Sequence, residues 1–363
     1  MAATMKSWMN KRIRPDDALL WESNLKRHVS GEYSMAIAQA NATLEDQSQV
    51  LASPSSTLVG VFDGHGGPDA ARFVNAHLFS NMTKLARERE GVSGEVIKKA
   101  FAATEEQFFR IVKQRVGSKP EIVSVGTCCL VAAIFGENLF VANLGDSRAV
   151  LGKKSLDGDR IVAERLSRDH NVSVEDVRKE VEALHPDDKH IVMFIRGVWR
   201  IKGIIQVSRS IGDAYLKKPE TRYDAAVFQR GYHVPIKRPV ISSVPSIVSR
   251  TIKPEDMFLI LASDGLWEHL TDDEAVAMVA SNGRSGISRR LVTAAQKAAA
   301  SKMEVKFSEL KKVEKGARRN FHDDITVVVV YFDHRQASHN AVAGSVSPVD
   351  IFPLIEGRFD QGD

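Results

Sequence analysis

The stretch VFDGHGGPDAARFV, from Val61 to Val74, leads from a short apolar run into a run with helical character. Between the two runs lie an aspartate, a histidine and three glycines, and glycine allows the backbone to turn sharply. Pro68 follows where the first turn of a helix accepts a residue that lacks an N–H group. The stretch therefore predicts a strand, a tight turn that carries polar side chains, and a helix.

Further strand-like and helix-like segments extend in groups on both sides of this stretch. Runs of apolar, β-branched and aromatic residues predict strands at residues 33–40, 56–62, 122–135, 138–143, 147–151, 201–207, 257–262 and 325–332. Apolar spacings of three and four predict helices at residues 68–90, 94–115 and 287–303, and a capping-box sequence, Thr271 to Glu274, precedes another. Because the strands follow one another in meanders, we expect an α+β fold of two stacked antiparallel β-sheets flanked by pairs of helices.

The same segments suggest how the chain is divided. We expect an N-terminal extension at residues 1–30, one folded domain at residues 31–333 and a C-terminal tail at residues 334–363. Residues 215–245 are rich in Pro, Lys, Arg and Tyr and have no clear period, which predicts an ordered surface excursion beside a functional site. This excursion is a candidate for substrate or regulator choice, and a solvated basic loop is an equally good interpretation.

Composition limits the classes of function. The formal charge of +4 is small, and no run of Lys and Arg interleaved with aromatic residues suggests a nucleic-acid groove, so we expect no nucleic-acid partner. The two cysteines, Cys128 and Cys129, lie in an apolar run and are expected to be buried in a strand of a protein from a reducing compartment. We therefore expect an intracellular protein of the cytoplasm or nucleus. The basic N-terminus leaves organellar targeting or a peripheral membrane location open.

Three aspartates occur in the same context, at an end of an apolar strand. Asp63 and Asp264 follow predicted strands, and Asp323 precedes one. Strand ends from different parts of a sheet can meet at one edge, so these carboxylates are expected to converge. Each Asp-Gly pair taken alone is more often a turn than a ligand. The combination of three acids with the DGHGG sequence favours a metal centre.

The residue types indicate which metal and which chemistry. Crowded carboxylates repel one another and raise their pKa values, so they usually hold a hard cation with oxygen ligands, and Mg²⁺ or Mn²⁺ is the natural choice. The tight turn would also bring the carbonyl of Gly64 to the metal. A pair of such ions would activate a water toward phosphorus, and His65 is placed to protonate the leaving oxygen.

Seven motifs carry a resemblance to a known family. They are VFDGHGG, SVGTCCLVAAI, ANLGDSRAVL, SRDH, VSRSIGD, LASDGLW and HDDITVVVV, in this order. The sequence resembles the metal-dependent protein serine/threonine phosphatases of the 2C type, the PPM family, from about Gly31 to Asp333. ANATLEDQSQV, SIGDAYLKKPE and RNFHDDITVVVV resemble a plant subgroup that is linked to dephosphorylation of plasma-membrane proton pumps. The resemblance implies the same pair of antiparallel sheets flanked by helices, with a metal cleft at one edge. It also implies direct hydrolysis of phosphoserine and phosphothreonine by a water activated between two Mn²⁺ or Mg²⁺ ions.

By match of motif, the resemblance also implies roles for individual residues. Asp63 would bridge the two ions, Gly64 would give its carbonyl to one, and Asp264 and Asp323 would hold the other. His65 would be the general acid. Four further acids are candidates for water-mediated contacts or for a weaker third metal: Glu45, Asp46, Asp146 and Asp213.

Two positions depart from the family pattern. Many members have a phosphate-binding arginine four residues before the first acid of the LEDQ pair, and this chain has Asn41 there. Glu268 stands where many relatives have an aspartate near the third metal. These departures keep a second hypothesis open, a catalytically weak member that acts as a scaffold. An unrelated two-metal nuclease is a third, and it lacks the basic groove that it would need.

Partners are also implied by the resemblance. We expect phosphorylated protein substrates, with a membrane proton pump as one candidate, and inhibitory regulator proteins as candidate binding partners. Nothing in the sequence demands more than a monomer.

Overall fold

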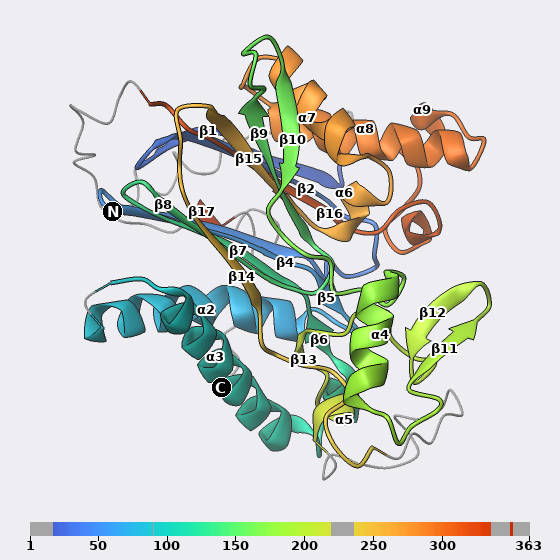
Figure 1. Ribbon diagram of the computed structural model, residues 1–363. Helices are drawn as coiled ribbons and strands as arrows, with labels where there is room; N and C mark the ends of the chain where they lie inside the picture. Colours follow the sequence, from blue (N-terminus) through green and yellow to red (C-terminus); the bar gives the residue numbers. More distant parts are fainter. Residues whose placement is uncertain (1–16, 90, 219–235, 335–348, 351–363) are drawn as a thin grey trace, which may run out of the picture.

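The computed structural model describes residues 17–89, 91–218, 236–334 and 349–350. Within them, two six-stranded sheets stack face to face, and every pairing between neighbouring strands in these sheets is antiparallel (Figure 1). The predicted α+β architecture is confirmed.

The first sheet has the strand order β1-β2-β16-β15-β9-β10. Its strands are β1 (Leu20–His28), β2 (Gly31–Ala38), β16 (Ile325–Tyr331), β15 (Asp256–Ala262), β9 (Arg148–Lys154) and β10 (Ile161–Arg165). The second sheet has the order β14-β8-β7-β4-β3-β17. Its strands are β14 (Ser246–Thr251), β8 (Asn138–Leu144), β7 (Cys129–Phe135), β4 (Ser56–Phe62), β3 (Gln47–Ala52) and β17 (Val349–Asp350).

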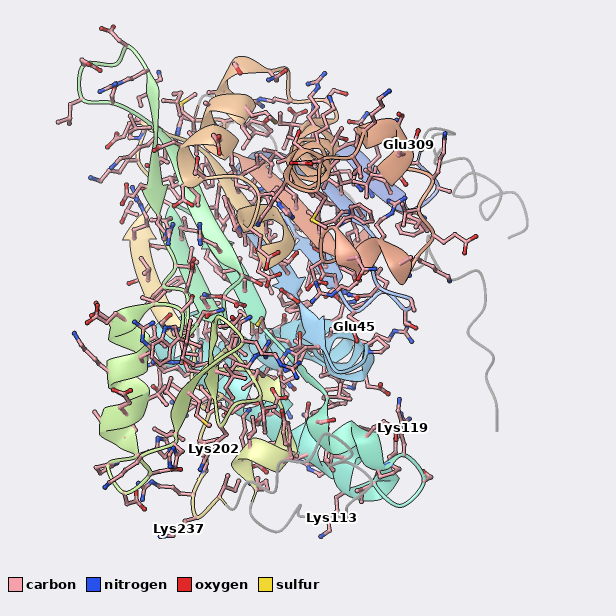
Figure 2. All side chains as sticks on the ribbon, turned by 90° about the vertical axis from the view of Figure 1, so that its right-hand side faces the viewer. Glu45, Lys113, Lys119, Lys202, Lys237 and Glu309 are labelled. Atoms are coloured by element: carbon pink, nitrogen blue, oxygen red, sulfur yellow. The ribbon has the colours of Figure 1, made fainter. Side chains whose placement is uncertain are left out.

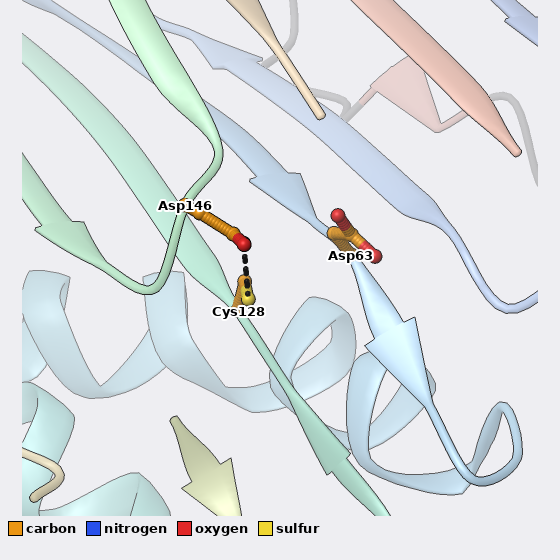
Figure 3. A group of neighbouring side chains, drawn as sticks. All are labelled: Asp63, Cys128 and Asp146. Atoms are coloured by element: carbon orange, nitrogen blue, oxygen red, sulfur yellow. Dashed lines mark hydrogen bonds between the residues drawn. The ribbon is translucent and has the colours of Figure 1, made fainter. Parts of the chain in front are cut away.

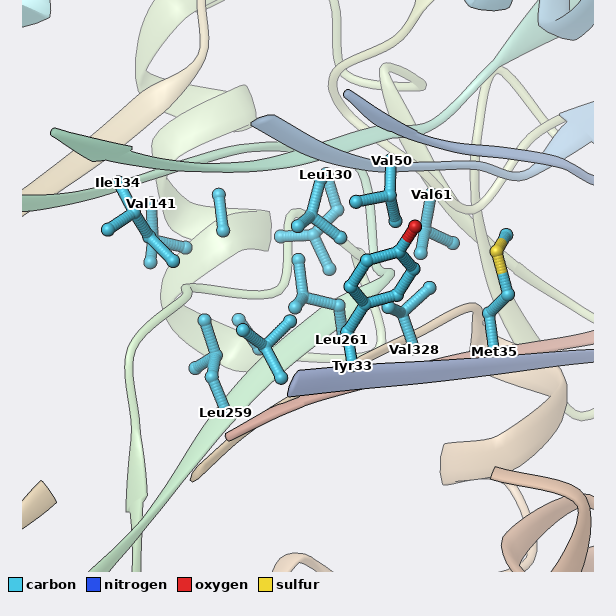
Figure 4. Packing of buried hydrophobic residues seen from close by; sticks show 14 of the residues in the cluster. Tyr33, Met35, Val50, Val61, Leu130, Ile134, Val141, Leu259, Leu261 and Val328 are labelled. Carbon is cyan, nitrogen blue, oxygen red and sulfur yellow. The ribbon is translucent and has the colours of Figure 1, made fainter. Parts of the chain in front are cut away.

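The core between the sheets is formed by alternate residues of their facing strands (Figure 4). Val328 and Val330 of β16 point into this core, while Val327 and Val329 point to the opposite face. A strand buried on both faces needs an uninterrupted apolar sequence, which explains why all seven residues of β16 are buried. The prediction of a central strand here is confirmed.

Helices cover the outer face of each sheet. In Figure 1, α2 (Asp69–Glu88) and α3 (Gly94–Arg115) lie below the second sheet, and α7 (Asp272–Ser281) and α8 (Ile287–Lys302) lie above the first. Their apolar faces form two further clusters with those sheets. The capping box predicted at the start of α7 is present, since Thr271 and Glu274 exchange hydrogen bonds between side chain and backbone. Two short helices, α6 (Asp264–Trp267) and α9 (Phe307–Leu310), contact α8.

A smaller unit lies at one end of the sandwich. It contains α4 (Glu175–Leu184), the hairpin of β11 (Val192–Ile195) and β12 (Val198–Ile201), and α5 (Ala214–Lys217). A three-stranded sheet with the order β13-β6-β5 joins this unit to the sandwich. Its strands are β5 (Gly64–His65), β6 (Gly126–Thr127) and β13 (Ile211–Gly212). The sheet therefore brings His65 close to the end of β13.

Two strand predictions were wrong in part. Residues 120–124 form a 3₁₀ helix instead of the start of a strand at residue 122. Residues 202–207 form no strand, because Lys202 and Gly203 adopt left-handed conformations, with φ of 54° and 72°, and reverse the chain. The N–H of Ile201 then donates to the carbonyl of Ile205.

The predicted boundaries also need correction. The domain begins before residue 31, because β1 pairs with β2 as the edge strand of the first sheet. Within the predicted tail, β17 pairs with β3. Most of the predicted excursion, residues 219–235, lies outside the described residues, as does most of the predicted N-terminal extension.

None of the helices in the described ranges has both the length and the apolar character that a membrane span requires.

Candidate metal centre

The three aspartates predicted to converge lie at one edge of the sandwich. Asp63 connects β4 to β5, Asp264 is the first residue of α6 just beyond β15, and Asp323 lies two residues before β16. Burial raises the pKa of Asp63 well above its ordinary value, and the charges of Asp264, Asp46, Asp323 and Asp146 raise it further. The structure thus brings five carboxylates into one electrostatic cluster, which we call the acidic centre: Asp46, Asp63, Asp146, Asp264 and Asp323.

Asp146 lies beside Asp63 in this centre, together with a residue that the sequence placed only in the core (Figure 3). Ligand atoms of Asp63, Cys128 and Asp146 all lie within 4.8 Å of one another. The Cys128 thiol donates to Oδ1 of Asp146 over 3.3 Å, and Nδ2 of Asn171 donates to Oδ2 over 2.7 Å. Burial and the charges of Asp146 and Asp63 raise the pKa of Cys128 well above its ordinary value. The side chain therefore remains a neutral thiol that donates a hydrogen bond to Asp146.

The acid pair of the LEDQ sequence also lies here, with two different environments. Asp46 is buried, and its Oδ2 accepts hydrogen bonds from Ser263 Oγ at 2.9 Å and Thr326 Oγ1 at 2.6 Å. Glu45 is partly buried, and burial followed by the charges of Asp324 and Asp323 raises its pKa to about 7. Figure 2 shows Glu45 close to α2, which is drawn in light blue.

Asp324, which sequence reasoning did not assign, fixes the loop that carries this acid pair. Its Oδ1 accepts from the N–H groups of Ala40 and Asn41 at 2.7 and 3.0 Å, and its Oδ2 accepts from the N–H of Glu45 at 2.8 Å. Three backbone donors beyond the end of β2 are thereby satisfied by one buried carboxylate. The two adjacent aspartates of the HDD sequence were the signal from which a role for Asp324 could have been predicted. Asp324 holds the loop, and the adjacent Asp323 belongs to the acidic centre.

Asp323 also has two neighbours that carry donors. Nδ2 of Asn41 donates to its Oδ1 over 2.9 Å, and Nη2 of Arg319 lies 2.7 Å from its Oδ2. The Arg319 side chain remains 52% exposed, so it lies at the rim of the centre. Glu268, at the end of α6, is also exposed. The pKa of Asp264 is raised mainly by burial and by the charges of Asp146 and Asp323, and the charge of Glu268 makes a smaller contribution.

His65 is paired with Asp213. Its Nε2 lies 2.8 Å from Oδ2 of Asp213, whose side chain is fully buried. Burial alone would lower the pKa of His65, but Asp213 outweighs this and the pKa is raised. Asp213 was predicted as a candidate for a water-mediated or third-metal contact. The structure places its Oδ2 against His65.

The donor set fits a hard cation. Like charges crowded in a partly dry site are unfavourable unless a cation neutralises them or they bind protons. Among the described residues, Oδ1 of Asp264 is buried without a hydrogen-bond partner, although a buried carboxylate oxygen normally has one. Carboxylate oxygens are the ligands that Mg²⁺ and Mn²⁺ prefer. The residues present are therefore suited to holding such ions.

Comparison with known sequences gives consistent results. The sequence profile of the family described as "Protein phosphatase 2C" matches residues 29–304, a range that includes Asp63 and Asp264 and ends before Asp323. "Probable protein phosphatase 2C 63" of Arabidopsis thaliana is 56% identical over 354 residues, which are 95% of this chain and 93% of that protein. "Probable protein phosphatase 2C 78" of Oryza sativa subsp. japonica is 56% identical over 93% of this chain and 88% of its own.

The fold is also found among solved structures. The crystal structure of serine-threonine phosphatase 2C from Toxoplasma gondii has a TM-score of 0.59 at 16% identity, over 86% of this chain and 99% of that chain. At this identity the likeness concerns the fold alone. The sequence profile and the plant relatives extend over most of the chain, so it belongs to the protein phosphatase 2C family of metal-dependent serine/threonine protein phosphatases.

Proposed function

We propose that Asp63, Gly64, Asp264 and Asp323 hold two Mn²⁺ or Mg²⁺ ions and that hydrolysis of phosphoserine and phosphothreonine takes place beside them. The observation that carries this proposal is the acidic centre itself, in which burial and mutual repulsion raise the pKa of Asp63 and of Asp264. When bound, the cations would supply the positive charge that stabilises a phosphoryl group and lowers the pKa of water. Asp146, held by Asn171, would contribute to a third, weaker site.

Glu45 and Asp46 would orient water at this centre. Ser263 and Thr326 fix one oxygen of Asp46, so its other oxygen keeps a defined direction. Glu45 is held through its backbone N–H by Asp324. The Asp46 carboxylate and the Glu45 backbone thus have supports that do not depend on a bound ion.

His65 would donate the proton that the leaving oxygen needs. In the proposed step a bond forms between a water oxygen and phosphorus, the bond from phosphorus to the serine or threonine oxygen breaks, and that oxygen takes a proton from His65. The attacking water loses a proton to solvent, and solvent returns one to His65. Since Nε2 bonds to Asp213, Nδ1 is the nitrogen available to the substrate. No covalent enzyme intermediate is proposed, because the Cys128 thiol is neutral and donates to Asp146.

Arg319 would bind the substrate phosphate in place of the arginine that is absent at position 41. Its guanidinium contacts the same Asp323 carboxylate as the Asn41 amide, so the two side chains lie beside each other at the rim. An exposed guanidinium can form two parallel hydrogen bonds to a phosphate. Neutralisation of Asp323 by a cation would release Arg319 for this contact.

The sequence resemblance also supports a proposal for the substrate and the partners. We propose a membrane proton pump as one phosphorylated substrate and regulator proteins as inhibitors, with the enzyme active as a monomer in the cytoplasm or nucleus or at a membrane surface. The three sequence segments shared with the proton-pump-linked plant subgroup support the substrate, and two of them, around Asn41 and Arg319, lie at the acidic centre.

Calorimetric titration of the metal-free protein with Mn²⁺, and separately with Mg²⁺, tests the proposed ligands. We expect two ions per chain and a third that binds more weakly. Asp63→Asn should lose the two, and Asp146→Asn should affect only the third. Asp256→Asn is the matched control, because Asp256 is a buried acid at the opposite end of β15, paired with Arg250. Unchanged binding by Asp63→Asn would refute the proposed centre.

A further inference from the structure

A buried ion pair lies outside the acidic centre. Glu105 of α3 and Lys217 of α5 are 2.6 Å apart, and their side chains are 6% and 5% exposed. Removing two charges from water is costly, and such a pair is retained only where further hydrogen bonds satisfy its remaining atoms. The partners of those remaining atoms therefore indicate what the pair does.

Both partners hold the same short loop. The Glu105 Oε2 accepts from the N–H of Gly212 at 2.8 Å, and the Lys217 Nζ donates to the carbonyl of Ser210 at 2.6 Å. Gly212 is the residue before Asp213, and α5, which carries Lys217, begins at the residue after it. The pair thus fixes the chain on both sides of Asp213.

Asp213 itself adopts a conformation that needs such support. Its φ and ψ are 52° and 47°, in the left-handed region that residues other than glycine seldom occupy. Its N–H donates to the carbonyl of Val125, and its fully buried side chain meets Nε2 of His65. A residue in a strained conformation persists where its surroundings determine it, and here Glu105 and Lys217 are part of those surroundings.

We propose that Glu105 and Lys217 are positioning residues for proton transfer: they hold Asp213 in its left-handed conformation and thereby orient the His65 ring toward the leaving oxygen. This inference rests on the proposed role of His65 as proton donor. The alternative is a purely structural role, in which the pair joins α3 to α5 and its loss affects every activity of the enzyme equally.

The choice of leaving group separates the two roles. Threonine leaves phosphorus as an alkoxide and needs a proton, whereas p-nitrophenol is acidic enough to leave without one. The Glu105→Leu, Lys217→Met double variant removes both charges together, which avoids an unpaired buried charge and preserves folding better than either single change. The Arg250→Met, Asp256→Leu double variant removes a partly buried pair elsewhere and serves as the matched control.

We expect the Glu105 and Lys217 double variant to lose at least about tenfold in kcat on a phosphothreonine peptide and less than about twofold on p-nitrophenyl phosphate, with KM unchanged on both. The control should show no difference between the two substrates. Equal losses on both substrates would overturn the positioning role and leave the ion pair as a structural contact.

A His65→Ala background tests the route through His65. His65→Ala alone should lose about 100-fold or more on the peptide and little on p-nitrophenyl phosphate, and adding the double variant should cost nothing further. If the double variant lowers kcat on the peptide by the same factor in the His65→Ala background as in the wild type, the inference is refuted while the proton-donor role stands. Equal losses of His65→Ala on both substrates would refute the proton-donor role, and with it the inference.

Discussion

The His65 imidazole and the Asp213 carboxylate meet across Gly126. These side chains come from the outer strands of the small sheet, β5 and the end of β13, and Gly126 lies on β6 between them. A Cβ atom on Gly126 would lie 2.2 Å from Oδ2 of Asp213 and 2.5 Å from Nε2 of His65. The pairing of histidine and aspartate therefore depends on the absence of a side chain at position 126.

Gly126→Ala should separate His65 from Asp213. Both clashing atoms belong to the pair, so we expect a loss of at least about tenfold in kcat on a phosphothreonine peptide. Gly136→Ala is the control for added side-chain bulk at a glycine, because a Cβ there meets nothing within 4 Å, although its φ of 56° adds some strain. Steady-state kinetics of both variants measures this loss in kcat. Wild-type turnover by Gly126→Ala would contradict the assigned pairing.

Asp264→Asn should stabilise the metal-free protein. Burial and the charges of neighbouring acids raise the pKa of Asp264. The same two causes raise the pKa of Glu45 to about 7. An acid whose pKa is higher in the folded than in the unfolded state stabilises the fold at a pH below its unfolded-state pKa. This stabilisation is lost as the pH rises through the folded-state pKa. In EDTA at pH 7.5 we expect Asp264→Asn to raise the free energy of unfolding by about 1 kcal/mol. Thermal unfolding measures this, and a lower Tm for the variant would count against charge repulsion at the centre.

His28 should produce the opposite dependence on pH. Its pKa is lowered to about 4 by burial, and its neutral ring donates from Nε2 to the carbonyl of Tyr331 over 2.9 Å. The group stabilises the fold above its unfolded pKa of about 6.5, and this contribution is lost as the pH falls toward 4.

Replacement by glutamine tests this contribution. Between pH 7.5 and pH 5 the wild type should lose up to about 2 kcal/mol more than His28→Gln in urea denaturation with metal-free protein. Equal losses in the two proteins would show that His28 is not held neutral in the folded state.

Arg319→Ala should weaken phosphate binding. Loss of a charge-assisted contact worth about 1 to 2 kcal/mol predicts a KM for phosphopeptide raised about 5- to 30-fold with little change in kcat. Adding Asn41→Arg should restore part of the affinity, since position 41 contacts the same carboxylate of Asp323. Lys302→Ala, at the end of α8, is the control for loss of a nearby positive charge, because Lys302 and Arg319 both lower the pKa of Glu268. An unchanged KM in Arg319→Ala would exclude it as the phosphate ligand.

Local sequence signals predicted the elements with strong patterns. The β4 strand has the predicted bounds, 56–62, and the apolar run of β16 and the capping box at Thr271 specify their elements without help from distant residues. The convergence of Asp63, Asp264 and Asp323 was also predictable, because each lies at a strand end.

Other features depend on contacts between distant segments and could not be predicted. Cys128 and Cys129 are neighbours of the same type, yet Cys129 packs against the helices below the second sheet while Cys128 meets Asp146. The β-branched sequence at residues 122–125 suits a strand, but Ile122 and Val123 pack in a 3₁₀ helix against α3. Glu105 likewise supports Asp213 through a hydrogen bond to the neighbouring Gly212, which lies 107 positions away in the sequence.

The central claim is that the acidic centre binds the metal ions on which phosphatase activity depends. The most direct measurement is phosphate release from a phosphothreonine peptide by purified protein with Mn²⁺, Mg²⁺ or EDTA, beside Asp63→Asn. We predict turnover with either metal, none in EDTA, and a loss of at least about 100-fold in Asp63→Asn. Turnover that persists in EDTA or in a folded Asp63→Asn variant would contradict the account, as would no turnover by the folded wild type with any metal.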